Sequence, residues 1–362
     1  MRYVDEFRDP AAAGRLADRI RATVTRPWTL MEVCGGQTHA IVRFGIDRLL
    51  PEGVSLLHGP GCPVCVTPVG IIDQALALAA RPGITLCSFG DMLRVPGTSG
   101  DLIAARTVGA DVRVVWSPLD ALAVARASPE RQVVFFAVGF ETTAPAVAMA
   151  VHRAAAEGLE NLSFLVAHVL VPPALAAIAG ARPRAVDGFL AAGHVCAIMG
   201  VDEYRPLAER YRVPIVVTGF EPLDLLQGML QCLQQLEGGR AEVENAFART
   251  ARDDGNAAAR AMIERVFEVV PRAWRGLGTL PDSGLGLRPA YAHLDAVERF
   301  DLAGIQGRED PRCRAGDVLQ GQLLPTDCPE FDRACSPDRP LGAPMVSAEG
   351  ACAAWHRFRR HT

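Results

Sequence analysis

Eight short apolar runs of strand length alternate with longer helical patterns over the first two thirds of the chain. Near-continuous apolar strands joined by helices are typical of parallel sheets that are covered on both faces. The sequence therefore predicts an α/β fold. Strands are expected at Thr29–Val33, Val54–His58, Ile84–Phe89, Val112–Trp116, Val133–Val138, Leu162–Ala167, Val186–Leu190 and Pro214–Thr218, and helices at residues 10–25, Val69–Ala80, Thr143–Glu157 and Pro222–Leu236.

A short motif repeats at the ends of two of these runs and indicates internal duplication. Gly139-Phe140-Glu141 and Gly219-Phe220-Glu221 each end an apolar strand and open a helix. Eight strands fit two similar parallel-sheet units better than one large sheet, with a boundary near Ser117-Pro118. Ligands are then expected at the carboxyl ends of the strands, where these turns lie.

The segment 271–362 differs in character from the rest of the chain. Residues 238–270 look helical, with breaks at Gly238-Gly239 and Asp254-Gly255-Asn256, but the segment after Pro271 is rich in Gly, Pro, Arg and Asp and has few convincing strands. A loop-rich segment of this kind builds a poor core. Its four cysteines are therefore expected to hold a metal that supplies folding energy.

The composition excludes several classes of function. A net charge of -4 gives no electrostatic footprint for nucleic acid or an anionic membrane, and no apolar run reaches the ~18 residues that span a bilayer. The stretch Met1–Phe7 lacks the apolar core of a signal peptide, so a cytoplasmic location is expected. Disulfides are rarely stable there, so ten cysteines, several of them clustered, indicate metal or redox chemistry.

Three thiols lie at predicted strand-to-helix turns. They belong to Cys34-Gly35-Gly36-Gln37-Thr38-His39 and to Gly59-Pro60-Gly61-Cys62-Pro63-Val64-Cys65. Backbone N–H groups converge at such turns and the helix dipole favours anions, so these cysteines are expected to lose their protons easily and, as thiolates, to attack or bind metal. His39, one turn into its helix, either accepts a proton and orients a ligand or is an ordinary hydrogen-bonded helix residue.

Cys62 and Cys65 form a C-x-x-C pair. Two thiols at this spacing can close a disulfide, share a metal, or exchange between those states. The alternative is half of a structural zinc site, for which a second C-x-x-C would be expected, and the sequence has none. Redox chemistry or a functional metal is the favoured interpretation.

Other candidate residues lie later in the chain. The C-x14-C-x6-C-x16-C spacing of the tail suits either zinc or an iron–sulfur cluster and does not choose between them. Glu141 and Glu221 offer carboxylates at helix starts, although each also favours a helix N-terminus electrostatically. His168 and His194 end apolar strands and fit hydrogen-bonded core residues. The tail cysteines are Cys313, Cys328, Cys335 and Cys352.

With these motifs assembled, the sequence resembles the HypD family of [NiFe]-hydrogenase maturation proteins over essentially its whole length. Several long motifs occur in the order typical of that family. The matching pieces are Cys34–His39, Gly59–Pro68, Gly139–Thr143, Gly219–Asp224 and Met345–Ala354.

The resemblance implies a scaffold on which the Fe(CN)2CO unit of the hydrogenase is assembled, in complex with HypC and with cyanide from HypE. It implies that Cys34 binds the mononuclear iron together with a cysteine of HypC, and that Cys62 and Cys65 are a redox-active pair close to that iron. It also implies that the four tail cysteines hold a [4Fe-4S] cluster that passes electrons to the pair. The expected domains are 22–118, 119–238, and an iron–sulfur domain made of 1–21 with 239–362.

Two further readings stay open, and three positions depart from the family pattern. The alternatives are an iron–sulfur-dependent dithiol oxidoreductase and a structural zinc protein without electron transfer. Ala315 stands where the family commonly has a second cysteine, Cys196 where it has serine, and Val169 where it has lysine. The last change removes a positive charge beside His168.

Overall fold

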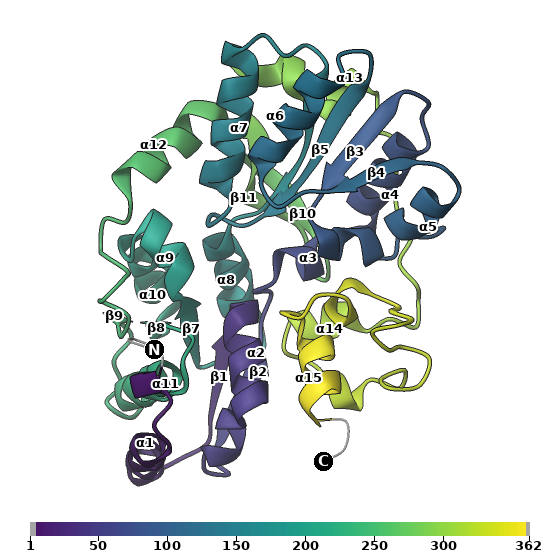
Figure 1. Cartoon of the computed structure of the whole chain (residues 1–362). Coiled ribbons are helices and arrows are strands. Elements are labelled where there is room, and N and C mark those ends of the chain that lie inside the picture. The colour runs from purple at the N-terminus through teal and green to yellow at the C-terminus, as the bar shows by residue number, and fades with distance from the viewer. Residues whose placement is uncertain (1–4, 360–362) are drawn as a thin grey trace.

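The computed structural model describes residues 5–359 and contains two parallel sheets (Figure 1). The expectation about Met1–Phe7 falls partly on residues 1–4, outside the described range. The first sheet has the order β2-β1-β7-β8-β9, and the second has the order β4-β3-β5-β6. Their strands are β1 (Trp28–Glu32), β2 (Val54–His58), β7 (Gly188–Ala192), β8 (Ile215–Thr218) and β9 (Val243–Asn245), and then β3 (Ile84–Ser88), β4 (Asp111–Val114), β5 (Gln132–Gly139) and β6 (Leu162–His168).

Helices cover both faces of each sheet, which confirms the predicted fold class of two parallel-sheet α/β units with a loop-rich C-terminal region. No helix among residues 5–359 has the length and apolar character needed to cross a bilayer. The helices are α1 (Pro10–Thr23), α2 (Gly35–Phe44), α3 (Pro63–Val66), α4 (Val69–Ala79), α5 (Leu102–Thr107), α6 (Pro118–Ala127), α7 (Ala144–Ala156), α8 (Val171–Gly180), α9 (Gly193–Met199), α10 (Arg205–Tyr211), α11 (Pro222–Glu237), α12 (Ala257–Val266), α13 (Ala296–Arg299), α14 (Ala315–Leu319) and α15 (Ala351–Arg359).

Successive residues of β1 and β7 point to opposite faces of the first sheet and belong to different apolar cores. Leu30 and Leu190 pack with α1, α2 and α11, whereas Met31 and Phe189 face the core formed with α8, α9 and α10. Because side chains alternate along a strand, a sheet covered on both faces needs apolar residues at both sets of positions. The continuous apolar runs of the sequence satisfy this requirement.

The strands are not divided between the two sheets at the predicted boundary near residues 117 and 118. The second sheet consists entirely of the segment 84–168, inserted between β2 and β7 of the first sheet. The amino-terminal helix α1 also differs from its expected place beside the tail, because it packs against α11, and Ala13 and Ile20 share one apolar core with Leu230 of α11. Strand pairing over long sequence distances decides these groupings, and local patterns do not show it.

The segment 238–287 contains more strand than the sequence indicates. Val243–Asn245 adds to the edge of the first sheet as β9, and the antiparallel hairpin β10 (Phe267–Trp274) and β11 (Gly278–Leu287) follows α12. The predicted helix over 238–270 is therefore correct only for α12. Glycines in β11 weaken the strand pattern of the sequence. A Cβ on Gly284 would lie 1.8 Å from Cγ of Arg272, so only glycine at this position leaves room for the Arg272 side chain to lie across the neighbouring strand.

The tail ends in α15, which packs against α2 and brings the C-terminal segment to the first sheet (Figure 1). The rings of Phe358 and His39 pack edge to face, with their centroids 5.2 Å apart. Arg359 forms an ion pair with Asp47. These contacts place the cysteine-rich tail beside the helix that follows Cys34.

Candidate functional site

Cys34 lies at the point where the first sheet changes the direction of its strand order. After β1 the chain moves to β2 on one side, whereas β7, on the other side of β1, leads away to β8. Open α/β sheets bind ligands outside the carboxyl ends of strands at such a switch point. Cys34 follows β1, Gly59 and Cys62 follow β2, and His194 follows β7, so all four meet at this edge.

The sulfur of Cys34 faces the imidazole of His194. Sγ lies 3.7 Å from Nδ1, and Cys34 is only 2% exposed. The ring of Phe220, after β8, lies 5.1 Å from the His194 ring and covers it. The sequence interpretation left His194 as a core residue; its place directly after an apolar strand was the signal that could have put it in the site.

Burial raises the pKa of Cys34, so the expected easily ionised thiol is absent from the isolated chain. Desolvation of the sulfur is the largest cause, and the nearby carboxylates of Glu349 and Glu32 raise the pKa further. The backbone N–H groups of Gln37 and Gly36 lower it, as the helix start predicts, but they do not compensate. Burial also lowers the pKa of His194 to about 4, which leaves its imidazole neutral.

This electrostatic state suits a metal-binding thiol. A buried thiol beside a neutral imidazole holds its proton until a cation replaces it, because the metal supplies the charge that the low-dielectric site lacks. Soft thiolate and imidazole donors suit iron, copper and zinc. Cys34 and His194 could therefore act together as donors to one metal ion.

Glycines let two segments approach the turn of Cys34 closely. A Cβ on Gly61 would lie 2.1 Å from the backbone nitrogen of Cys34, and one on Gly35 would lie 2.5 Å from Cβ of Glu349. The N–H of Gly35 donates to the carbonyl of Gly61 at 2.8 Å. The loop of the C-x-x-C pair and the tail segment at Glu349 are thus in direct contact with the turn that carries Cys34.

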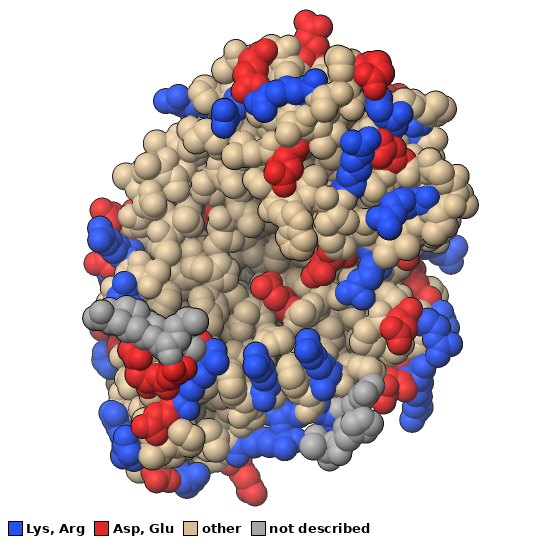
Figure 2. Space-filling model, viewed as in Figure 1, with Lys and Arg blue, Asp and Glu red and all other residues tan. Residues whose placement is uncertain are grey.

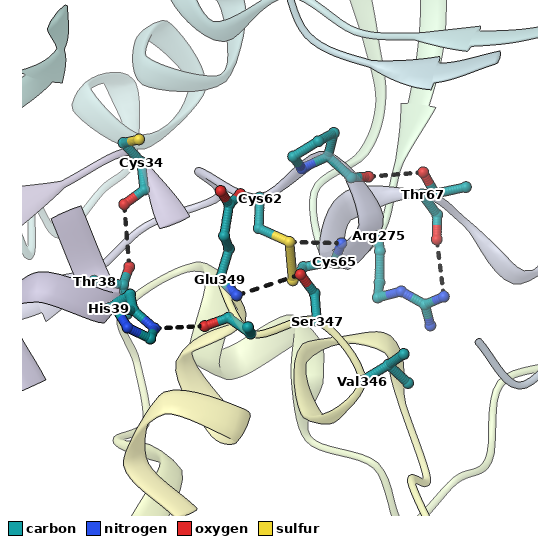
Figure 3. The surroundings of a disulfide bond; sticks show 12 residues. Cys34, Thr38, His39, Cys62, Cys65, Thr67, Arg275, Val346, Ser347 and Glu349 are labelled. Carbon is teal, nitrogen blue, oxygen red and sulfur yellow. Dashed lines mark hydrogen bonds between the residues drawn. A yellow bond between two sulfur atoms is a disulfide. The ribbon is translucent and has the colours of Figure 1, made fainter. Parts of the chain in front are cut away.

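The polar residues after Cys34 hold the turn in place. Gln37 donates to the carbonyl of Ala191 at 3.1 Å and to the hydroxyl of Thr218 at 2.7 Å, which ties α2 to the ends of β7 and β8. His39 lies farther along α2, and its Nδ1 is 3.1 Å from the carbonyl of Ala348 (Figure 3). The structure therefore brings His39 to the tail, and His194 rather than His39 lies against the sulfur.

Cys62 and Cys65 form a disulfide at the start of α3 (Figure 3). Both are buried, at 3% and 1% exposure. The Sγ of Cys62 accepts the N–H of Cys65 at 3.3 Å and caps the short helix. The pair belongs to the same apolar core as Cys34, and the backbone contact of Gly61 with the Cys34 turn connects the two motifs.

Arg275 links the C-x-x-C helix to the tail. Its guanidinium donates to the carbonyl of Thr67 at 2.8 Å and pairs with Glu309 at 2.9 Å, and its N–H donates to the carbonyl of Val66 at 2.7 Å (Figure 3 shows the bond to Thr67). The side chain is buried, and its charge lowers the pKa of Cys313, although burial raises that pKa to about 11 overall.

The four tail cysteines line one cavity, whose other walls are mainly apolar. A Cβ on Gly342 would lie 2.4 Å from Sγ of Cys313, so glycine makes room for that sulfur. Within residues 5–359, no three His, Cys, Asp or Glu side chains are close enough to hold one metal ion. The 3-10 turn Ala343–Met345, which forms part of the cavity wall, also packs against α3. The cysteines are Cys313, Cys328, Cys335 and Cys352.

Glu141 and Glu221 have different environments. Glu141 is fully buried, accepts the N–H of Val171 at 2.7 Å, and lines a cavity of about 490 Å³; burial raises its pKa to about 8. Glu221 caps α11 and pairs with Arg8, which accords with a helix-start role. The Nε2 of His168 is 3.1 Å from the Thr143 hydroxyl, inside the second unit.

The comparisons with known proteins concern nearly the whole chain. The family profile HypD, described as "Hydrogenase formation hypA family", matches residues 11–359. "Hydrogenase maturation factor HypD" of Azotobacter vinelandii is 50% identical over 370 residues, which cover 99% of this chain and 97% of that protein. The protein of the same description from Escherichia coli (strain K12) is 46% identical, with 99% of each chain covered. That of Rhodobacter capsulatus is also 46% identical and covers 99% of this chain and 98% of that protein.

Proposed function

The chain belongs to the HypD family, and from that premise we propose that it is a hydrogenase maturation factor on which the Fe(CN)2CO unit is assembled at Cys34. The iron is the cargo of this reaction. The observation that carries the proposal is the pairing of Cys34 with His194 at the switch point of the first sheet, next to the disulfide of Cys62 and Cys65.

The chain's own groups around Cys34 fit an iron carrying cyanide. The thiolate supplies a soft, anionic donor. Backbone N–H groups of Gly36 and Gln37, at the start of α2, face the sulfur and can donate to anionic ligands bound beside it. The neutral imidazole of His194 offers either a lone pair or an N–H at the same place, according to its tautomer.

We propose that the Cys62–Cys65 pair exchanges electrons with a centre in the tail. The four thiols surround one mainly apolar cavity without converging on a single point. This fits a cluster, because each cysteine of a four-iron cluster binds a different iron and the four sulfurs lie farther apart than the ligands of one ion. When bound there, a [4Fe-4S] cluster would supply single electrons. Reducing the disulfide takes two electrons and two protons. The turn Ala343–Met345 packs against α3 and also lines the cavity, so it connects the two.

We propose HypC and HypE as the partners. A second cysteine, from HypC, would complete the thiolate donors at Cys34, and HypE would deliver cyanide. Figure 2 shows a hollow in the middle of one face whose surface carries few charged residues, with Arg, Asp and Glu gathered around it. A surface with an uncharged centre and a charged rim is typical of a protein-binding site.

A dithiol oxidoreductase that acts on other proteins is the second candidate, since the C-x-x-C pair is present as a disulfide. Such an enzyme must expose at least one sulfur to its substrate. Both sulfurs here belong to residues that are 3% exposed or less. This burial supports an electron transfer inside the protein instead.

The test is Cys34→Ser in the complex with HypC, purified without oxygen. We expect the variant to keep the iron of the tail and to lose the additional iron of the complex. Cys87→Ser, a fully buried thiol in the second sheet, is the matched control and should keep both. Equal iron content in Cys34→Ser and the wild type would contradict the proposal.

A further inference from the structure

Glu32 is a fully buried carboxylate at the end of β1 whose two oxygens are both engaged by the chain. Oε2 accepts the N–H of Cys34 at 2.9 Å. Oε1 accepts Nδ1–H of His58 at 2.7 Å and the hydroxyl of Thr38. A carboxylate whose oxygens already accept three donors is poorly placed to bind a metal, so its role concerns the residues that it holds.

The protonation of His58 follows from its other neighbour, Trp355. The indole nitrogen of Trp355 lies 2.8 Å from Nε2 of His58, and an indole N–H can only donate. Nε2 must therefore carry the lone pair, which puts the proton of the neutral imidazole on Nδ1, directed at Glu32. Trp355 thus selects the tautomer that donates to the carboxylate.

This arrangement explains why position 32 is acidic. All the atoms that face its oxygens are donors, so an amide there would direct its NH2 group at another donor. A buried carboxylate is tolerated when its lone pairs are satisfied in this way. The negative charge lies next to Cys34, where it opposes an anionic sulfur but attracts a metal cation bound to that sulfur.

The chain of hydrogen bonds crosses from the tail to the turn that carries Cys34. Trp355 belongs to α15, the helix that also contains Cys352. Its indole bonds to His58 at the end of β2, which pairs in register with Glu32 of β1. Glu32 then holds the N–H of Cys34. Three hydrogen bonds therefore connect the helix of a tail cysteine to the backbone of the early one.

We propose that Glu32 is a positioning residue for the metal-binding thiol of Cys34, and that Trp355, through His58, makes this positioning depend on the seating of α15 in the tail. The inference rests on the proposed function for Cys34 as a metal ligand. It adds that the tail, besides holding its own centre, orders the iron site through Trp355, His58 and Glu32. An unseated α15 would free the His58 tautomer, so Glu32 would lose its fixed imidazole donor and keep only Thr38 and the N–H of Cys34.

The test uses Co²⁺ as the probe, titrated without oxygen into the full chain with its tail centre loaded. The thiolate–cobalt absorption band reports metal bound through sulfur, and Cys34→Ser gives the baseline. Glu32→Gln and Trp355→Phe should each weaken Co²⁺ binding about tenfold, as expected for one hydrogen bond to a charged group. Glu130→Gln and Trp116→Phe, at exposed positions, are the matched controls and should bind as the wild type does.

A conservative variant separates the relay from simple packing. In His58→Asn the amide nitrogen takes the place of Nδ1 and donates to Glu32 without needing Trp355 to fix a tautomer. This variant should bind Co²⁺ within about twofold of the wild type, a difference too small to mark a lost hydrogen bond. Adding Trp355→Phe to it should then have no further effect; a further loss in the double variant would contradict the relay.

The outcomes distinguish this inference from the proposal on which it rests. If Cys34→Ser binds Co²⁺ with the wild-type band, the proposed function of Cys34 fails. If Cys34→Ser loses the band while Glu32→Gln and Trp355→Phe match the wild type, Cys34 stands as a ligand and the positioning role is overturned. Should Glu32→Gln fail to fold, Trp355→Phe carries the test, because Trp355 is only half-buried and phenylalanine keeps most of its ring.

Discussion

The sulfur of Cys34 lies 3.7 Å from Nδ1 of His194, although 160 positions separate the two residues in the sequence. Parallel pairing of β1 with β7 brings them together, because each residue follows the carboxyl end of its strand. A thiol and a neutral imidazole thus meet in a buried corner at the edge of the sheet. The predictions below follow from this contact and from the groups connected to it.

Replacing His194 should weaken metal binding at Cys34 without removing the tail centre. His194→Ala deletes the only side-chain partner that the structure gives to the Cys34 sulfur in residues 5–359. We expect about a tenfold weaker hold on the additional iron, since one interaction with a charged group is lost. Iron analysis before and after dialysis against a chelator measures this. His152→Ala, outside the site, should behave as the wild type does.

Removing both thiols of the C-x-x-C pair should stop the redox step and leave the fold intact. Cys62→Ser with Cys65→Ser removes the disulfide, while the loop Gly59–Gly61 keeps its contact with Cys34. We expect tail iron to remain and delivery of a completed iron unit to a hydrogenase to fall to background. Delivery at the wild-type rate by this double variant would show that the pair has no redox role.

Loss of any tail cysteine should remove the tail centre and lower stability together. The tail contains only short helices around the cavity, so a bound centre supplies much of its folding energy. In Cys335→Ala, for example, we expect loss of the brown colour and iron content and a lower unfolding temperature. A colourless wild-type protein with one zinc would instead support the structural-zinc alternative.

The stability difference between the wild type and Glu141→Gln should depend on pH. Burial raises the pKa of Glu141 from 4.5 to about 8. The unfolded carboxyl ionises first, so the wild type loses stability relative to the variant as pH rises between these values, by at most about 1.4 kcal/mol per pH unit. The difference should level off above pH 8. Denaturant unfolding at several pH values measures it, and a pH-independent difference would contradict the buried, neutral carboxyl.

The fold class was predictable because its signal is local. Each of the eight apolar runs overlaps an observed parallel strand, and Val54–His58 coincides with β2 at both ends. Grouping the strands was less successful, since pairing β1 with β7 closes a gap of more than 150 residues. The strand β9 was missed because its pairing with β8 at the edge of the sheet overrides the local helix signal. The hairpin of β10 and β11 was missed because the glycines that make room for side chains of the opposite strand read as loop residues in the sequence.

Within the site, the motifs identified the early cysteines but not their environment. The family resemblance implied that the C-x-x-C pair lies close to Cys34, and in the structure Gly61 of that loop contacts the backbone of Cys34. The helix-dipole argument predicted an easily ionised Cys34, which is wrong for the isolated chain because desolvation raises its pKa instead. Burial depends on tertiary packing, including the tail segment at Glu349, and no local pattern reveals it. The contact of His194 with the Cys34 sulfur was missed for the same reason.

The most direct test of the account is Mössbauer and infrared spectroscopy on the 57Fe-enriched complex with HypC, compared between the wild type and Cys34→Ser. The account predicts two iron components in the wild type, a four-iron cluster and a single low-spin iron with CO and CN stretching bands. Cys34→Ser should retain only the cluster. A single-iron component with unchanged CO and CN bands in Cys34→Ser would contradict it.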